Sequence, residues 1–170
     1  MKNFVSRRAW VVAFLFTAFC LPAIAQTGND RDSRIVGTWV LVSAVNTQAD
    51  GTKSDVFGTG PRGRATFTAG GQFSVLFSRD GLPKFASGNR QTGTPEENQA
   101  IVKGSLAYAG SFSTDAAKKV LTTNIDASTF PAWIGDAQKR NYTIAGDQLE
   151  WVGVTGAQGG NLVITLKRMK

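Results

Sequence analysis

One arginine in the C-terminal half of the chain is predicted to point toward the protein interior. In residues 139–144, Arg140 is in phase with Tyr142 and Ile144, whereas the intervening residues are all polar. Because successive side chains of a strand point to opposite faces, Arg140 should share the buried face. A buried guanidinium needs either a carboxylate of the protein or an anionic group on a ligand. Two interpretations stay open here. Arg140 has a structural role, either in an internal ion pair or as a strand-end arginine that reaches water, or it anchors an anionic ligand.

Aromatic side chains are predicted to line the same interior. Seven of them recur at alternate positions of strand-like runs: Phe67, Phe73, Phe77, Tyr108, Phe112, Tyr142 and Trp151. They form either a filled core or the wall of a cavity. Small residues at in-phase positions, such as Ala65 and Gly110, shorten the lining and favour some remaining space.

A further ring, Trp133, falls in the loop 130–135, where it either plugs the core or contacts a ligand at the rim. The candidate ligand-binding residues are therefore Arg140, Tyr142, Tyr108, Trp133, Phe67, Phe77 and Trp151. No catalytic residue is assigned.

Histidine and cysteine limit the chemistry further. The chain has no histidine, and its one cysteine, Cys20, lies in a segment that we expect to be removed on export. This composition excludes disulfides, Ser-His-Asp triads, cysteine nucleophiles, and zinc or haem sites built on these ligands. We expect no metal site and no cofactor, and the remaining repertoire is carboxylates, lysine, tyrosine, serine and threonine.

The first 25 residues have the three parts of a cleaved secretory signal. Lys2, Arg7 and Arg8 give a positive start, residues 9–21 are apolar with one threonine, and Ala23-Ile24-Ala25 is a small-x-small cleavage site. Cleavage after Ala25 would make the protein periplasmic or secreted. The paired arginines leave the twin-arginine route open beside the general secretory one.

Two partner classes are not expected. The apolar run is shorter than the about 20 residues that span a membrane, so stable membrane insertion is not expected. The mature basic residues are spread along the chain rather than clustered, which argues against a nucleic-acid partner. The oligomeric state is left open.

Behind a polar stretch at 26–34, predicted to be a flexible leader, residues 35–170 form one domain of short strands joined by glycine-bearing turns. About eight strands are predicted, with a further short one near 56–57: 35–45, 64–68, 72–79, 107–113, 120–128, 138–144, 148–154 and 161–168. Thr94-Pro95-Glu96-Glu97 forms a capping box that predicts one helix over 95–103. The fold class is therefore all-β, most simply an antiparallel up-and-down barrel, because closure removes exposed edges.

The two ends of the domain carry a predicted structural pair. Trp39 opens the first strand within Gly37-Thr38-Trp39, and Arg168 ends the last strand. If the sheet closes, these strands are neighbours, and the guanidinium of Arg168 can lie on the Trp39 ring as a cation-π contact that seals one end of the barrel.

In these features the sequence resembles the lipocalins, whose members share Gly-x-Trp on the first strand and a basic residue packed against it from the last. More closely it resembles the bacterial and fungal lipocalin-like domain family, as an exported bacterial member. The matching stretches are residues 35–43, 50–58, 63–77, 107–112 and 131–135, with Arg140.

The resemblance implies an eight-stranded barrel around a small-molecule cavity. It leaves the function open: binding of a small hydrophobic molecule, with or without an anionic group paired with Arg140, or isomerisation or cyclisation of such a molecule with help from Tyr108, Tyr142 or Arg140. A third, structural reading has no cavity and a surface used for protein contacts. Some relatives carry a histidine where this chain has residues 122–124, Thr-Thr-Asn, so no acid-base role can be transferred from that histidine.

Overall fold

The computed structural model describes residues 31–153 and 160–170. The predicted signal peptide and most of the predicted leader therefore lie outside the described residues. Within the described part, no helix is long and apolar enough to cross a membrane. The same residues contain no group of three or more acidic or cysteine side chains arranged to hold a metal ion.

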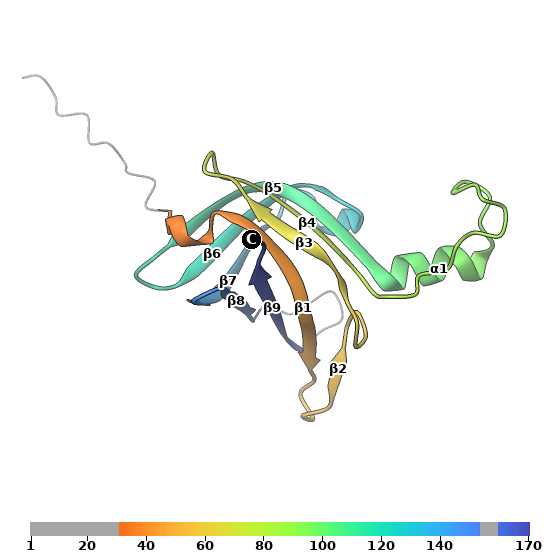
Figure 1. Cartoon of the computed structure of the whole chain (residues 1–170), viewed down its shortest axis with the longest axis horizontal. Helices are drawn as coiled ribbons and strands as arrows, with labels where there is room; N and C mark the ends of the chain where they lie inside the picture. The colour runs from red at the N-terminus through yellow and green to blue at the C-terminus, as the bar shows by residue number, and fades with distance from the viewer. Residues whose placement is uncertain (1–30, 154–159) are drawn as a thin grey trace, which may run out of the picture.

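A single antiparallel sheet curls into a closed barrel (Figure 1). Its strands are β1 (Gly37–Thr47), β2 (Lys53–Asp55), β3 (Arg62–Phe67), β4 (Gln72–Ser78), β5 (Ser105–Asp115), β6 (Val120–Ser128), β7 (Ala137–Ala145), β8 (Gln148–Val152) and β9 (Asn161–Arg168). Each strand from β3 to β9 pairs with the next, and β1 pairs with both β3 and β9, which closes eight strands into the barrel. The lipocalin-like all-β fold expected from the sequence is confirmed. The additional short strand is β2, just before the expected position, and it pairs with the end of β1.

Alternation of side chains separates the barrel core from its outer surface. In β4, Phe73, Val75 and Phe77 are buried, while the residues between them are exposed. The same alternation in β7 places Tyr142 inside and its polar neighbours outside. At Gly63 in β3 a Cβ atom would lie 2.0 Å from the carbonyl oxygen of Leu76, so the close pairing of β3 and β4 requires glycine there.

One helix interrupts the meander between β4 and β5. Helix α1 (Pro95–Gly104) begins with the predicted capping box: the Thr94 side chain accepts from the backbone N–H of Glu97, whose carboxylate accepts from the backbone of Thr94. In Figure 1 the helix stands away from the barrel body, at the end where β4 stops and β5 begins. The predicted helix is therefore confirmed, and its last turn leads directly into β5.

The opposite end of the barrel is closed by the segment that precedes β1. A short 3-10 helix, η1 (Ser33–Ile35), crosses this end, and the indole N–H of Trp39 donates to the carbonyl oxygen of Ile35 at 2.8 Å. Arg168 lies over the Trp39 ring, with its Cζ atom 4.1 Å from the ring centroid. Its guanidinium also donates to the carbonyl oxygens of Val36 and Arg34, so the first and last strands are tied together here.

Candidate functional site

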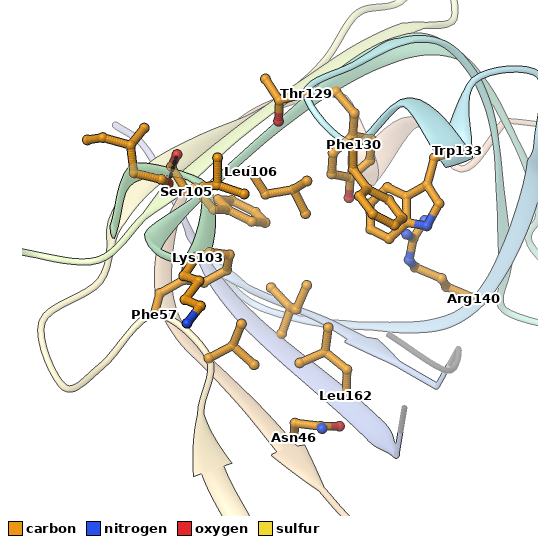
Figure 2. Close-up of a pocket in the computed structure, with 16 residues that line it drawn as sticks. Asn46, Phe57, Lys103, Ser105, Leu106, Thr129, Phe130, Trp133, Arg140 and Leu162 are labelled. Atoms are coloured by element: carbon orange, nitrogen blue, oxygen red, sulfur yellow. Dashed lines mark hydrogen bonds between the residues drawn. The ribbon is translucent and has the colours of Figure 1, made fainter. Parts of the chain in front are cut away.

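A cavity of about 380 Å³ lies at the end of the barrel remote from η1. Its wall comes from strand ends, from the last turn of α1, and from the segment around the short helix η2 (Pro131–Trp133). Figure 2 shows Leu106 and Leu162 entering it from different sides. The lining residues are Asn46, Val56, Phe57, Phe77, Ile101, Val102, Lys103, Ser105, Leu106, Tyr108, Thr129, Phe130, Trp133, Arg140, Leu162 and Ile164. Concave, mainly apolar sites of this size with a few polar groups are typical of small-molecule pockets.

Arg140 places a positive charge on this wall, held by neighbouring side chains. Its Nη1 donates to the Thr123 hydroxyl at 2.9 Å, and its Nη2 donates to the side-chain oxygen of Gln138. The guanidinium also lies 5.9 Å from the Tyr108 ring centroid and 6.0 Å from that of Trp151. Among the residues that the structure describes, no carboxylate lies within ion-pair distance of Arg140. Neutral partners therefore orient the charge without neutralising it.

Tyr108 places a hydroxyl group on the same wall. Its side chain is 5% exposed, and its ring packs edge-on against Trp133 and Phe73 at 5.4 and 5.7 Å between centroids. Burial raises the pKa of the Tyr108 hydroxyl, and the positive charge of Arg140 opposes that rise. The hydroxyl is accordingly protonated at neutral pH and is available as a hydrogen-bond donor.

Four of the seven candidate ligand-binding residues lie on the cavity wall: Phe77, Tyr108, Trp133 and Arg140. Phe67 and Trp151 are buried in the aromatic layer behind it, where Trp151 contacts Phe67 at 5.8 Å and Phe77 at 6.2 Å between centroids. Tyr142 lies toward the opposite end of the barrel, and its hydroxyl donates to Asp32 at 2.9 Å. Six of the seven residues thus lie on the inner face of the strands and Trp133 lies in η2, but the cavity occupies only one end of that face.

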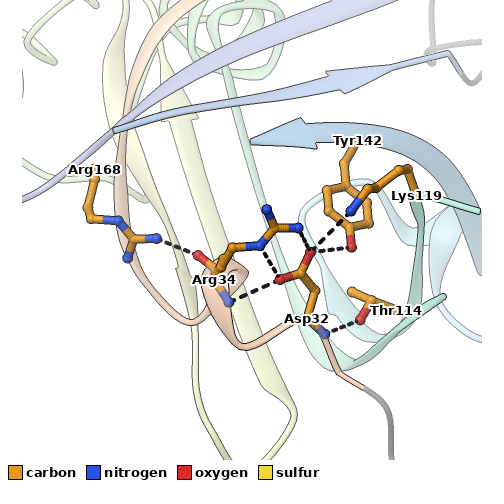
Figure 3. Close-up of polar contacts among 6 residues, drawn as sticks. All are labelled: Asp32, Arg34, Thr114, Lys119, Tyr142 and Arg168. Atoms are coloured by element: carbon orange, nitrogen blue, oxygen red, sulfur yellow. Dashed lines mark hydrogen bonds and ion pairs between the residues drawn. The ribbon is translucent and has the colours of Figure 1, made fainter. Parts of the chain in front are cut away.

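The polar cluster around Asp32 occupies the closed end (Figure 3). Its buried carboxylate accepts from the backbone and guanidinium of Arg34 and from Tyr142, and Lys119 lies 3.8 Å away. The hydrogen bonds from Arg34, opposed by burial, lower the pKa of Asp32 to about 2. Burial and the hydrogen bond to the Asp32 carboxylate raise the pKa of Tyr142 to about 12. This part of the site is structural in character.

The position of Asp32 differs from the sequence-based expectation. Residues 26–34 were expected to form a loose leader, yet Asp32 is 7% exposed and caps η1. Its backbone N–H donates to the hydroxyl of Thr114 at 2.7 Å. The polar composition of the segment did not distinguish a solvated tail from a carboxylate that satisfies buried donors.

Sequence analysis missed several lining residues, and their positions explain why. Ile101 and Val102 belong to the last turn of a helix that was assigned no role, although two adjacent apolar residues there were a usable signal. Asn46 points inward because the register of β1 shifts between Leu41 and Ser43, which reverses the alternation. No sequence pattern had indicated that bulge.

Comparison with known proteins gives one curated relative and one family. The chain is 33% identical over 83 residues to the 4'-hydroxy-3'-methoxypropiophenone carrier protein ppsC of Aspergillus oryzae, which covers 45% of this chain and 75% of the carrier. Residues 36–162, which include seven of the eight barrel strands in full and the start of β9, match the lipocalin-like domain. The closed barrel and its cavity are consistent with this sequence match, and the chain belongs to the lipocalin-like domain family.

Proposed function

We propose that this protein is an exported carrier that binds one small hydrophobic molecule in the cavity, with an anionic group of that molecule held at Arg140. One observation carries the proposal: Arg140 lies on the cavity wall with neutral partners, and no described carboxylate is within ion-pair distance. A partly buried guanidinium whose partners are all neutral keeps its full charge, and on the wall of a cavity an anion of a ligand can pair with it.

The rest of the wall suits an apolar ligand body. Phe57, Phe77, Leu106 and Ile164 are buried or half-buried around the cavity, and Trp133 covers Tyr108 from the η2 segment. Transfer of apolar ligand surface from water to these side chains contributes about 25 cal/mol per Å². Affinity for the ligand body would come from this surface, and orientation would come from Arg140.

The curated relative supports a small cargo. That fungal protein is named as the carrier of a propiophenone with hydroxyl and methoxy substituents, a small aromatic molecule with several oxygen atoms. We extend the carrier role and the size of the cargo to this chain, but not the identity of the molecule.

The isomerase or cyclase alternative lacks a supporting group. Such chemistry needs a general base or acid with a pKa near the working pH at the cavity. The described lining contains no carboxylate, and burial keeps the Tyr108 hydroxyl protonated. Binding is therefore the function that these residues favour.

Export is part of the proposal. Its basis is the positive start, apolar run and Ala23-Ile24-Ala25 site of the sequence. N-terminal sequencing of protein recovered from the periplasm or medium of a bacterial host should give Gln26 as the first residue. Recovery of uncleaved protein in the cytoplasm alone would refute export without affecting the binding proposal.

Binding can be tested with β-naphthoate, a rigid apolar body with one carboxylate, by isothermal titration calorimetry. We expect saturable binding of one molecule per chain to the wild-type protein. Leu106→Trp fills the cavity and should abolish this binding, whereas Leu76→Trp, a matched change on the exposed outer face of β4, should preserve it. Equal binding by both variants would place the ligand elsewhere and contradict the proposal.

A further inference from the structure

The polar side chains of the cavity wall differ in how many hydrogen bonds they already make within the protein. Ser105 donates to the carbonyl oxygen of Ile101 at 2.7 Å, and the Thr129 hydroxyl both donates to and accepts from the backbone of Ala107. These two hydroxyl groups are therefore occupied by the protein itself. They leave little hydrogen-bonding capacity for a ligand.

Tyr108 and Arg140 are used far less. The Tyr108 hydroxyl makes no hydrogen bond within the part of the chain that the structure describes, although the side chain is more than nine-tenths buried. Arg140 has five N–H donors in its guanidinium, and the described hydrogen bonds engage one on Nη1 and one on Nη2. The Tyr108 hydroxyl and the remaining N–H groups of the half-buried Arg140 are therefore donors on the cavity wall that an acceptor on a ligand can engage.

The charge and hydrogen-bonding capacity of Arg140 and Tyr108 indicate which ligand groups can bind between them. The Arg140 guanidinium lies 5.9 Å from the centroid of the Tyr108 ring, so its field favours the rotamer of the hydroxyl whose lone pairs face the cation and whose proton points away from it. Guanidinium N–H groups can only donate. Both residues thus present donors, and Lys103 adds a positive charge on the same wall. An amine or another cation would be repelled here.

We infer that Tyr108 is the second head-group contact of the cavity and makes it selective for hydrophobic monocarboxylic acids. One carboxylate oxygen accepts from Arg140 and the other accepts from the Tyr108 hydroxyl, while the apolar body lies among Phe57, Leu106 and Trp133. The inference rests on the proposed carrier function and goes beyond it by naming the ligand class and a specificity-determining residue. A carboxylate satisfies both donors at once, and a single neutral oxygen does not.

The test compares β-naphthoate with β-ethylnaphthalene, which has a similar body and no acceptor, in wild type and Tyr108→Phe. We expect Tyr108→Phe to weaken naphthoate binding about tenfold and to change ethylnaphthalene binding less than about twofold. β-Nitronaphthalene, with two neutral acceptor oxygens, should bind between the two. Equal loss for naphthoate and ethylnaphthalene, or no loss for either, would overturn the role of Tyr108 while leaving the carrier function intact. Failure of every probe to bind the wild type would overturn both.

A measurement on the wild type keeps the inference testable if Tyr108→Phe unfolds. The chain has only two tyrosines, so carbon-13 at tyrosine Cζ gives two resonances, and Tyr142 serves as an internal reference because its hydroxyl is held by Asp32. Naphthoate should shift the Tyr108 resonance and ethylnaphthalene should shift it much less. A naphthoate shift confined to Tyr142, or equal shifts of Tyr108 with both probes, would refute the head-group contact.

Discussion

The two ends of the barrel use the same residue types for different purposes. At the closed end Tyr142 donates to a carboxylate of the protein, and Arg168 stacks on Trp39 and donates to two carbonyl oxygens. At the cavity end Tyr108 has no described hydrogen-bond partner, and Arg140 has only neutral ones. Both tyrosines and both arginines face inward, so their direction alone does not separate structure from function.

An internal carboxylate makes the difference between the two tyrosines, whereas the two arginines, which both have only neutral described partners, differ in whether they line the cavity. Asp32 comes from the segment before β1 and enters the closed end, where it accepts hydrogen bonds from Arg34 and Tyr142. No described acidic side chain enters the cavity wall. A buried hydroxyl held by an internal carboxylate stabilises the fold, whereas a hydroxyl or cation that lines the cavity without a carboxylate can pair with an anion of a ligand.

The largest expected effect tests the closed end. Asp32→Asn removes the charge that Arg34, Tyr142 and Lys119 share, and it should lower the free energy of unfolding by about 3 kcal/mol at pH 7. Urea unfolding followed by tryptophan fluorescence measures this change. Asp115→Asn, which breaks an exposed pair with Lys118, should lower the free energy of unfolding far less. An equal decrease in the free energy of unfolding of the two variants would show that the buried contacts of Asp32 stabilise the fold no more than an exposed ion pair does.

Acid should remove part of the same stabilisation. The pKa of Asp32 is lowered to about 2 in the folded protein, so as the pH falls the unfolded chain binds a proton first. The contribution of the ionised Asp32 carboxylate to the free energy of unfolding is fully present well above pH 4 and is lost toward pH 2. The free energy of unfolding of the wild type exceeds that of Asp32→Asn at pH 7, and we expect this difference to shrink by roughly 2 kcal/mol at pH 2. An advantage that stays constant from pH 7 to pH 2 would contradict this account.

The next largest effect contrasts the two inward arginines. Arg168→Gln should lower the free energy of unfolding by about 2 kcal/mol, because it removes the stacking on Trp39 and the bonds to backbone carbonyls. Arg140→Gln should change unfolding by less than about 1 kcal/mol and weaken naphthoate binding about thirtyfold.

Calorimetry gives the naphthoate affinity of both variants, and urea unfolding gives their free energy of unfolding. Lys139→Gln, the outward-facing neighbour of Arg140 on β7, controls for the loss of one positive charge. If Arg140→Gln destabilised the barrel as strongly as Arg168→Gln and left binding unchanged, the division between the two ends would fail.

The smallest expected effect concerns the helix that contributes to the cavity. Thr94→Ala removes the capping hydrogen bond to Glu97 and should destabilise α1 locally by about 1 kcal/mol. Hydrogen exchange should be faster in α1 alone, and naphthoate affinity should fall about twofold because Ile101 and Val102 lie on the wall. Thr92→Ala, just before the cap, should have neither effect. Faster exchange throughout the barrel would show that α1 is not an independent unit.

Much of the fold followed from the sequence because its signals are local. The turn glycines, the alternation in β4 and β7, and the capping box at Thr94 each fix a structure within a few residues. Closure of the sheet followed from the need to pair edge strands. The eight barrel strands and the one helix could therefore be predicted without coordinates.

The site was predictable only in part because it depends on long-range contacts. Alternation gave the inward direction of Arg140 and Tyr108, but also that of Tyr142, and it carried no information on which end of the barrel each would reach. That Asp32 would meet Tyr142, 110 residues later in the chain, followed from no local pattern. The place of α1 in the wall also depends on long-range contacts, and the two adjacent apolar residues Ile101 and Val102 were the one local sign of it.

The bulge in β1 has a consequence for how this protein can change. Trp39 and Leu41 precede it, whereas Ala44 and Asn46 follow it in the opposite phase; Ala44 still belongs to the core, and Asn46 lines the cavity. One strand thereby contributes to the closed end before the bulge and to the cavity wall after it. Substitutions after the bulge can alter which cargo is accepted while the half that holds the barrel shut stays constant, so new binding preferences can evolve on an unchanged framework.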